Sequence, residues 1–327
     1  MIEIDPLMPA RPTILVAEAD RFSPQAVARL ERVGRVELAD LDRPGLLAGV
    51  AEADVLWVRL RHRVDDEVLA AGPRLRVVVT PTTGLDHLDL EAADRRGVRV
   101  VALRGEIEFL REIRATAELT IALMLALLRN LPEAAEHVRE GGWDRDRFRG
   151  HELHEKTVGV VGMGRLGTIV ARYLQAFGAR VIAADPHRAP AEVPAGVELT
   201  GLDDLLRRAD LVTLHVSLSD ATCGLLGAAE LARMREGAWM VNTARGELVD
   251  EDALLEALRT GRLAGAALDV LRGERPSGMA DHPLVRHARE HGNLVITPHI
   301  GGATSESMAK TEQFLADRLA GILEGER

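Results

Sequence analysis

The sequence predicts an α/β protein with parallel sheets, divided into two domains. Short runs of β-branched and other apolar residues alternate with amphipathic stretches along most of the chain, which is typical of parallel strands joined by helices. The chain has 327 residues, and a domain usually contains roughly 100–200 residues. The alternation also falls into two series, which a long helical stretch and a polar segment separate.

Strand and helix signals place the elements of the first series in order. Four strands are expected, at Thr13–Ala19, Val55–Leu60, Arg76–Thr80 and Val98–Leu103. Ser23 followed by Pro24 predicts a helix start, because serine caps first-turn N–H groups and proline fits the first helical position. The long helical stretch then runs from about Ile113 to Arg139, and Pro132 predicts a kink or a break in it.

The second series opens at Lys156 and repeats strand and helix to about Val270. The segment Leu271–Gly292 is rich in charge, glycine and proline and predicts a loop. A last strand is expected at Leu294–Ile300, and Ser305–Glu324 predicts a terminal amphipathic helix.

Composition restricts the partners and the compartment. There are 41 Lys and Arg against 51 Asp and Glu, a net charge of −10, which argues against nucleic acid because neutralising phosphates requires a basic surface. The longest apolar run, Leu119–Leu128, is too short to cross a bilayer, and the N-terminus lacks the pattern of a signal peptide. The single cysteine, Cys223, predicts a reduced, buried or half-buried side chain in a cytoplasmic protein.

The most specific local motif is a glycine-rich turn. Gly162, Gly164 and Gly167 fit the pattern G-x-G-x-x-G. In such a turn the first glycine allows the tight bend, the second lets the backbone approach a pyrophosphate, and the third lets the helix pack close to the strand. N–H groups at the helix start, near Arg165 and Leu166, would then attract the phosphates.

The surroundings of this turn support a dinucleotide site. An apolar strand precedes it, a helix follows it, and the next strand, Arg180–Ala184, is followed by Asp185. An acid about 20 residues after the glycines is where the adenosine ribose would be bound. Asp185 would repel a 2′-phosphate, so NAD is favoured over NADP, although His187 and Arg188 weaken this preference. The alternative is a glycine turn in an α/β protein that binds no nucleotide.

Three further strands end in residues suited to carbonyl and alcohol chemistry. Arg245 follows one strand, Asp269 and Glu274 follow another, and His299 follows the last. An arginine binds a carboxylate with two parallel hydrogen bonds, a histidine supplies or removes a proton, and a carboxylate beside it orients the imidazole. Each residue also has an ordinary structural interpretation, and spacing alone does not bring the three together.

Four ordered segments resemble the D-isomer-specific 2-hydroxyacid dehydrogenases, the family that includes D-3-phosphoglycerate dehydrogenase. They are Gly162–Gly167, Val241–Asp252, Gly265–Pro276 and Thr297–Thr304, and the likeness extends to Thr80–Leu90 and Arg114–Arg129. The resemblance implies two doubly wound parallel-sheet domains, a Rossmann NAD-binding domain and a flavodoxin-like substrate domain, with the active site in the cleft between them. The implied substrate domain comprises residues 1–112 and 299–327, and the dinucleotide-binding domain comprises residues 113–298.

The resemblance also implies roles for individual side chains. Arg245 matches the arginine that binds the substrate carboxylate, His299 the proton donor and acceptor, and Glu274 the acid that pairs with that histidine. NAD would be bound by Gly162, Gly164, Arg165, Leu166, Gly167, Asp185, His215, Thr222, Thr243 and Asp269, the last of these at the nicotinamide carboxamide. No metal site is expected.

The expected substrate contacts lie in the first series. Backbone N–H groups of Thr83 and Gly84 would bind the substrate carboxylate, and Arg59 matches a position that binds a distal anion, with a solvated basic edge as the alternative. The segment Leu103–Ile113 departs from the family, because it replaces a shorter asparagine-containing linker, so the substrate stays open. The helix near Glu118–Arg129 matches the one that builds a dimer, and a homodimer is therefore expected.

The function expected from these observations is an NAD-dependent oxidoreductase. It would transfer hydride between nicotinamide and C2 of a small 2-hydroxyacid or 2-ketoacid, in the direction of ketoacid reduction, in the cytoplasm and with no membrane partner. An NAD(H)-sensing scaffold of the corepressor type is the alternative. Oxidation of phosphite or formate is a third hypothesis, which the acid at Glu274 makes less favourable.

Overall fold

The computed structural model describes residue 9, residues 11–274 and residues 278–325. The chain forms two compact units. Unit 1 runs up to Ile113 and resumes at Thr304, and unit 2 runs from Arg114 to Ala303. The return to unit 1 therefore comes later than the expected residue 299, and His299 belongs to unit 2.

Unit 1 contains a five-stranded parallel sheet. Its strands, in the order β2-β1-β3-β4-β5, are Arg35–Leu38, Thr13–Val16, Val55–Trp57, Val77–Thr80 and Arg99–Ala102. This is the flavodoxin-like strand order. Its helices are α1 (Pro24–Leu30), α2 (Arg43–Val50), α3 (Asp66–Ala71), α4 (Leu90–Arg95), α5 (Ile107–Leu110) and α13 (Ser305–Glu324).

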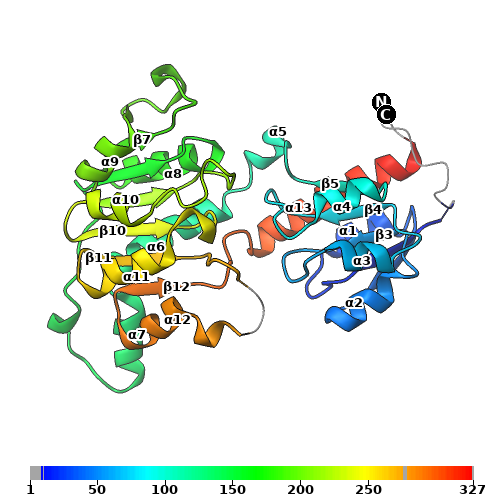
Figure 1. Ribbon diagram of the computed structural model, residues 1–327, viewed down its shortest axis with the longest axis horizontal. Coiled ribbons are helices and arrows are strands. Elements are labelled where there is room, and N and C mark those ends of the chain that lie inside the picture. The colour runs from blue at the N-terminus through cyan, green and yellow to red at the C-terminus, as the bar shows by residue number, and fades with distance from the viewer. Residues whose placement is uncertain (1–8, 10, 275–277, 326–327) are drawn as a thin grey trace. The chain divides into compact units, whose positions relative to one another are not determined.

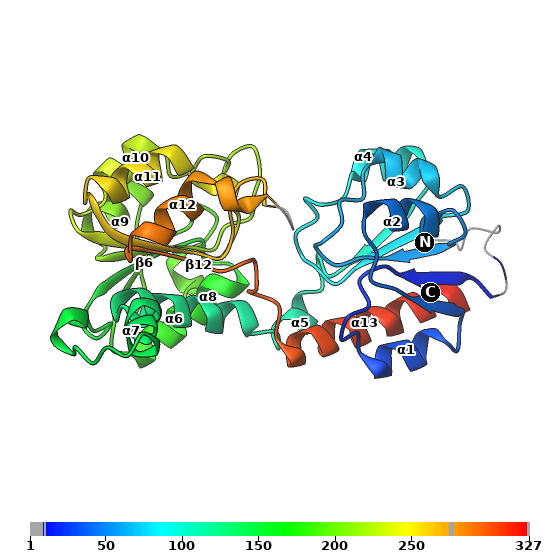
Figure 2. The same cartoon turned by 90° about the horizontal axis from the view of Figure 1, so that it is seen from below.

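Two helical layers cover this sheet. In Figure 2, α2, α3 and α4 lie on one face, and α1 and α13 lie on the other. Alternate residues of one strand enter opposite layers, because successive side chains of a strand point to opposite faces. In β1, Leu15 packs in the α2–α4 layer, whereas Ile14 and Val16 pack in the layer of α1 and α13.

Unit 2 contains a seven-stranded parallel sheet. Its strands, in the order β12-β11-β10-β9-β6-β7-β8, are Leu294–Ile296, Leu263–Leu268, Ala238–Asn242, Leu211–Leu214, Thr157–Val161, Arg180–Ala184 and Glu198–Leu199. The order reverses beside β6, as in a Rossmann sheet. Its helices are α6 (Ala115–Leu128), α7 (Leu131–Arg139), α8 (Arg165–Ala176), α9 (Leu202–Arg208), α10 (Ala228–Arg233), α11 (Glu251–Arg259) and α12 (Pro283–Glu290).

The sheet of unit 2 lies between two helical layers (Figures 1 and 2). Helices α6 and α8 pack on one face, and α9, α10, α11 and α12 pack on the other. Short 3-10 turns complete the described elements, at Asp146–Phe148, Pro190–Glu192, Gly246–Leu248 and Met279–Asp281. The predicted fold class, two doubly wound parallel-sheet domains, is confirmed.

Several boundaries differ from the prediction. The long helical stretch is two helices, and the chain breaks before Pro132, at Asn130, whose φ of 51° lies in the left-handed region. The expected loop Leu271–Gly292, of which residues 275–277 lie outside the described residues, contains α12. This helix begins at Pro283, and its few apolar residues stand among charged and histidine side chains. Cys223 is exposed and not buried, because it lies in the turn after β9.

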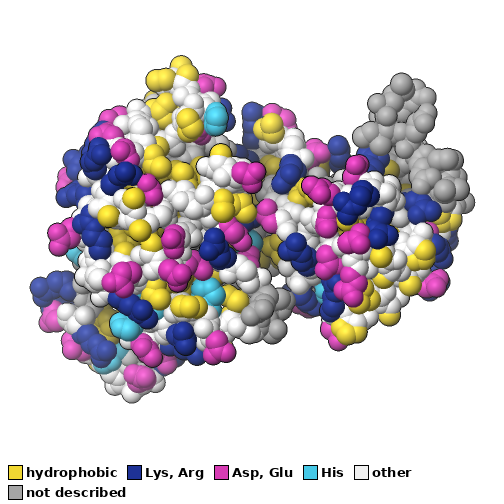
Figure 3. All heavy atoms as spheres, viewed as in Figure 1, with side chains coloured by type: hydrophobic (Ala, Val, Ile, Leu, Met, Phe, Trp, Pro, Cys, Tyr) yellow, Lys and Arg dark blue, Asp and Glu magenta, His cyan; other side chains and the backbone are white. Residues whose placement is uncertain are grey.

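Acidic and basic side chains are interspersed on the face drawn in Figure 3. No single helix of the described ranges has the length and hydropathy to cross a membrane, although the bent pair 107–128 and 131–139 reaches them jointly across a 65° bend.

Candidate functional site

The carboxyl ends of six adjacent strands in unit 2 are in register. The terminal residues pair across the sheet in the order Ala184, Val161, Leu214, Asn242, Leu268 and Ile296. Neighbouring strands are about 4.8 Å apart, so the residues that follow these ends lie along one edge. That edge carries Gly162, Asp185, His215, Thr243, Asp269 and Thr297 as the first residue after each strand.

The three glycines of the turn differ in whether the fold itself requires them. Gly162 has a φ of 93°, which favours glycine, and a Cβ on Gly167 would lie 1.9 Å from the Gly162 carbonyl oxygen. Gly164, by contrast, has no atom within 4 Å of an added Cβ. Packing within the described chain therefore needs the first and third glycines but not the second. The open space beside Gly164 is consistent with close approach of a dinucleotide.

The start of α8 adds donors to this turn. Its N-cap is Gly164, so no side chain caps the N–H groups of the first turn. Burial lowers the pKa of the Arg165 guanidinium at that position. An anion such as a pyrophosphate would be stabilised by these N–H groups and by the positive end of the helix dipole.

Asp185 connects the turn to the end of β7. Its Oδ2 accepts a hydrogen bond from the Met163 N–H at 2.8 Å, and its Oδ1 accepts one from the His187 N–H at 2.9 Å. A carboxylate offers about four lone-pair sites, so acceptor capacity remains for a ribose. The side chain therefore positions the glycine turn in addition to its predicted contact, a role that the sequence did not indicate.

His215 follows β9 at the same edge. Its Nε2 lies 3.0 Å from the Thr213 hydroxyl, and burial lowers the pKa of its imidazole to about 4. The ring is therefore uncharged near neutral pH. The nearby Thr222 hydroxyl donates to the Ser217 carbonyl at 2.7 Å and closes the following turn, so this threonine has a structural role beside its predicted one.

A buried asparagine holds the arginine segment after β10. The Asn242 amide donates to the Arg245 carbonyl at 2.8 Å and accepts from the Ala244 N–H at 3.0 Å. The Arg245 side chain donates to the Ala244 carbonyl at 2.7 Å, and the Thr243 hydroxyl lies 2.9 Å from that of Thr120 in α6. The sequence pattern did not single out Asn242, whose only signal was an amide at the end of an apolar strand.

Backbone contact brings the Arg245 segment against the loop that carries Glu274. A Cβ on Gly246 would lie 2.2 Å from the Leu271 carbonyl carbon and 2.3 Å from the Arg272 nitrogen. The Leu271 N–H in turn donates to Glu274 Oε2 at 3.3 Å. A larger residue at position 246 would therefore separate these two segments.

Asp269 organises the segment that carries the histidine. Its Oδ1 accepts from the Thr297 hydroxyl at 2.6 Å and from the Ile300 N–H at 2.8 Å, and its Oδ2 accepts from the Gly301 N–H at 2.8 Å. Burial nevertheless raises the pKa of this carboxyl group, while these hydrogen bonds oppose the shift. The sequence predicted a cofactor contact here, and the structure adds this positioning role.

His299 and Glu274 are in direct contact. The imidazole Nδ1 hydrogen-bonds Glu274 Oε1, and the His299 N–H donates to the Asp269 carbonyl at 2.8 Å. The backbone at His299 has a φ of 53°, a left-handed conformation that is uncommon for residues other than glycine. The histidine side chain is 23% exposed, and within the described residues its hydrogen bond to Glu274 uses only one of the two ring nitrogens.

The loop after β4 in unit 1 presents its N–H groups. The carbonyls of Thr82, Thr83 and Gly84 each accept a hydrogen bond, from the Leu103 N–H, Arg104 Nε and the Thr82 hydroxyl respectively. Among the hydrogen bonds of the described residues, none has the N–H of Thr83 or Gly84 as donor. Two adjacent N–H groups without an internal acceptor can bind a carboxylate.

Arg59 makes contacts that differ from those of a free substrate-binding arginine. Its Nε donates to Glu312 Oε1 at 3.0 Å, its Nη1 donates to the Asp20 carbonyl at 2.9 Å, and its Nη2 also binds Glu312. Glu312 is 1% exposed and accepts from the Ser23 N–H as well. All three guanidinium nitrogens are thus occupied within unit 1.

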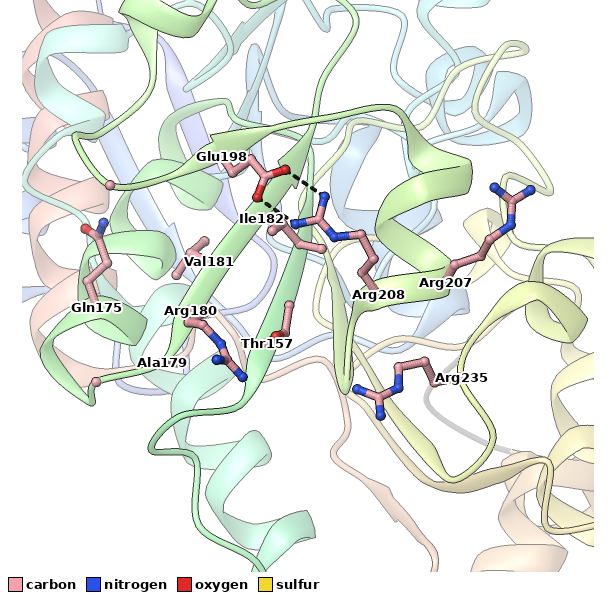
Figure 4. A pocket seen from close by; sticks show the side chains of 12 residues that line it. Thr157, Gln175, Ala179, Arg180, Val181, Ile182, Glu198, Arg207, Arg208 and Arg235 are labelled. Atoms are coloured by element: carbon pink, nitrogen blue, oxygen red, sulfur yellow. Dashed lines mark hydrogen bonds and ion pairs between the residues drawn. The ribbon is translucent and has the colours of Figure 1, made fainter.

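A cavity of about 790 Å³ lies at the amino ends of β6 and β7, remote along both strands from the glycine turn. Figure 4 shows four arginines around it, Arg180, Arg207, Arg208 and Arg235. Three of them pair with carboxylates: Arg207 with Asp203, Arg208 with Glu198 and Asp204, and Arg235 with Asp210. The local charge is nearly balanced, so we assign no anion site there.

Comparisons with known proteins identify the family of this chain. Residues 121–301 match the family described as D-isomer specific 2-hydroxyacid dehydrogenase, NAD binding domain. The chain is 42% identical over 317 residues to D-3-phosphoglycerate dehydrogenase of Mycobacterium bovis, covering 96% of this chain and 57% of that enzyme. It is 38% identical to glyoxylate reductase of Aeropyrum pernix, covering 96% of this chain and 94% of that enzyme. The chain thus spans little more than half the length of the mycobacterial relative.

Solved structures share the whole architecture. The TT0316 protein of Thermus thermophilus has a TM-score of 0.83 and 38% identity, covering 96% of this chain and 98% of that one. D-lactate dehydrogenase of Aquifex aeolicus, solved with NAD and lactic acid, has a TM-score of 0.82 and 26% identity, covering 96% of both chains. The chain belongs to the D-isomer specific 2-hydroxyacid dehydrogenase family.

Proposed function

We propose that this protein catalyses hydride transfer between NAD(H) and C2 of a small 2-hydroxyacid or 2-ketoacid, working as a ketoacid reductase. The observation that carries the proposal is the contact between His299 and Glu274 on the strand edge that also bears the glycine turn. Bound NADH supplies the hydride. The remaining tasks, binding the carboxylate and delivering a proton, belong to the side chains of the protein.

His299 is the proposed general acid. Its Nδ1 is engaged by Glu274, so the other ring nitrogen carries the proton that reaches the developing alkoxide oxygen. The Glu274 carboxylate stabilises the imidazolium before transfer and fixes the orientation of the ring. Asp269 and Thr297 fix the backbone on which the histidine stands.

Arg245 is the proposed ligand of the substrate carboxylate and polarises the neighbouring carbonyl. Its guanidinium suits this task because it presents parallel N–H donors to the two carboxylate oxygens. In unit 1, the N–H groups of Thr83 and Gly84 are proposed to bind a carboxylate as well. The resident cofactor would be bound by the glycine turn, Asp185 and the residues after β9, β10 and β11.

The test is an NADH-oxidation screen over glyoxylate, hydroxypyruvate, hydroxypyruvate phosphate, pyruvate, 2-ketoglutarate and branched ketoacids. The proposal predicts turnover with at least one of them, and a turnover lower by about 10²–10⁴-fold after replacement of His299 by Asn at the same enzyme concentration. Binding of NADH without oxidation by any ketoacid would favour the NAD(H)-sensing scaffold instead. Oxidation of phosphite or formate with NAD would favour the third hypothesis, which the His299–Glu274 pair makes less favourable.

Cofactor preference is proposed to follow Asp185. A carboxylate at this position repels a 2′-phosphate, and Asp185→Ser should therefore raise the ratio of kcat/KM with NADPH to kcat/KM with NADH. Because Asp185 also positions the Met163 N–H, the variant should lose some efficiency with both cofactors. A wild-type enzyme that already prefers NADPH would contradict this assignment.

A homodimer in the cytoplasm is proposed from the family resemblance. The α6 helix, expected at the interface, buries Ile121, Met124 and Leu128 in the core of unit 2. Apolar surface is instead exposed on α7 and the segment after it, at Leu131, Val138 and Trp143, the last 89% exposed. Sedimentation equilibrium of wild type and Trp143→Glu tests the dimer, which should dissociate in the variant.

A further inference from the structure

The segment Leu103–Ile113, which departs from the family pattern, returns to the loop with the exposed N–H groups. The Leu103 N–H donates to the Thr82 carbonyl at 3.1 Å, and Arg104 Nε donates to the Thr83 carbonyl at 3.4 Å. Gly105 follows with a φ of 91° and turns the chain away. Arg104 is therefore in contact with the proposed carboxylate-binding loop.

The rest of the segment is fixed by packing within unit 1. Phe109 in α5 stacks on Phe314 in α13 with ring centroids 4.0 Å apart, and Glu106 pairs with Arg318 at 3.1 Å. Leu110 and Ile113 are buried in the core beneath them. The backbone at Arg104 is therefore held between the loop after β4 and the docked α5 helix, although the arginine side chain itself is exposed.

Three arginines of unit 1 differ in the partners that they bind within the protein. Arg59 is neutralised by the buried Glu312, and Arg61 pairs with Asp40 at 3.3 Å. Within the described ranges, the Thr83 carbonyl is the single hydrogen-bond acceptor of Arg104, and no carboxylate pairs with it. The two terminal nitrogens of Arg104 therefore keep all of their N–H donors for a ligand, whereas each terminal nitrogen of Arg59 already donates one hydrogen bond within unit 1.

We propose that Arg104 determines substrate specificity by binding a second anionic group of the ketoacid, a distal carboxylate or a phosphate. The inference rests on the proposed dehydrogenase function. The N–H groups of Thr83 and Gly84 have no acceptor of their own and can bind the C1 carboxylate. The Arg104 guanidinium, bonded to the Thr83 carbonyl on the other edge of the same peptide, supplies a full positive charge to this loop for the second anionic group. A substrate with two anionic groups uses both, and a substrate with one leaves the arginine unpaired.

The test compares paired substrates that differ in distal charge. Hydroxypyruvate is compared with hydroxypyruvate phosphate, and pyruvate with oxaloacetate, for wild type, Arg104→Ala, Arg104→Lys and Arg111→Ala. Arg111 is the matched control, because it is an exposed arginine of the same segment whose partner is Glu108. Thermal melting of each variant checks that the fold is retained.

Arg104→Ala should lower kcat/KM for the doubly charged member of a pair by about 10- to 100-fold, which is the usual value of a hydrogen bond to a charged group. The loss should appear in KM, and the singly charged member should change by less than about threefold. Lysine should restore part of the loss, because it keeps the charge without the fork, and Arg111→Ala should match wild type. If Arg104 binds a phosphate, its replacement should lower kcat/KM more for hydroxypyruvate phosphate than for oxaloacetate. If it binds a distal carboxylate, the larger loss should be found with oxaloacetate.

Equal losses for both members of a pair, or no loss, would overturn the proposal. Calorimetric binding of the same paired compounds in the presence of NADH separates this inference from the proposed function. Tighter binding of the doubly charged compound by wild type, lost in Arg104→Ala, supports the role of Arg104 even when turnover is absent. Absent turnover by wild type would count against the dehydrogenase function alone, and equal binding by wild type and Arg104→Ala would overturn the inference alone.

Discussion

Two acid–base pairs, one in each unit, consist of similar residues and differ in what surrounds them. His299 and Glu274 in unit 2 are partly exposed, with 23% and 38% of their side chains accessible. Arg59 and Glu312 in unit 1 are 15% and 1% exposed. Both basic residues follow a strand of a parallel sheet, and both were candidates for chemistry on that ground. We propose different roles for them on the basis of their surroundings.

The two pairs differ in how many of their hydrogen-bonding groups are already used within the protein. The backbone around His299 is held by Asp269, Glu274 accepts a hydrogen bond from the Leu271 N–H, and the second ring nitrogen of His299 has no hydrogen bond among the described residues. Arg59 has all three nitrogens bound, and its carboxylate partner is buried. A charged residue at a strand end is thus a candidate for function only while it keeps an unused donor or acceptor facing solvent.

The largest expected effect is at His299. Replacement by Asn should lower kcat for ketoacid reduction by about 10²–10⁴-fold, the usual contribution of a general acid or base. Asparagine cannot exchange a proton near neutral pH, although it retains a hydrogen bond toward Glu274. Steady-state kinetics, with the melting temperature as a control for folding, gives the answer. Undiminished turnover would remove His299 from the mechanism.

The next effect concerns the pair in unit 1. Arg59→Ala leaves Glu312 buried without its partner, which should lower the free energy of unfolding by about 3 kcal/mol. Arg61→Ala breaks an exposed pair and should lower it by less than about 1 kcal/mol. Urea unfolding of both variants measures the difference. Unchanged stability together with a raised KM would restore Arg59 to the substrate-binding role that the family resemblance implied.

A smaller effect is expected from His215 as a function of pH. Its pKa in the folded protein is about 4, whereas that of an unfolded histidine is about 6.5. Between these values the unfolded chain binds a proton that the folded chain does not, so stability falls as the pH decreases through this window. His215→Gln should therefore lose less stability than wild type between pH 7 and pH 4.5. Parallel urea midpoints for the two proteins would contradict the shift.

Sequence patterns predicted the helices and turns whose ends depend on residues close by in the sequence, such as capping side chains and glycines. The terminal helix Ser305–Glu324 was predicted with the bounds that it has, because Thr304 caps its start and Gly325, with a φ of 82°, ends it. Ser23 caps α1 through the Ala26 N–H, as predicted. The glycine turn was predicted from spacing, and its first and third glycines have the geometry that this spacing requires.

Long-range partners could not be predicted from local pattern. Arg59 and Glu312 are 253 positions apart in sequence, and only the docking of α13 onto unit 1 brings them together. The α12 helix escaped prediction because its charged composition resembles a loop. The contact between His299 and Glu274 was expected from family resemblance and not from spacing, since it depends on Asp269, Leu271 and Gly246 holding two separate loops together.

The central claim is that the carboxyl edge of the unit 2 sheet binds the dinucleotide and that His299 acts beside it. Equilibrium NADH binding, followed by fluorescence in wild type, Gly164→Val and His299→Asn, tests it directly. A Cβ added at Gly164 would meet no atom within 4 Å, so we expect Gly164→Val to fold normally and lose NADH affinity, while His299→Asn should bind NADH like wild type and lose turnover. Wild-type NADH affinity in Gly164→Val would contradict the claim.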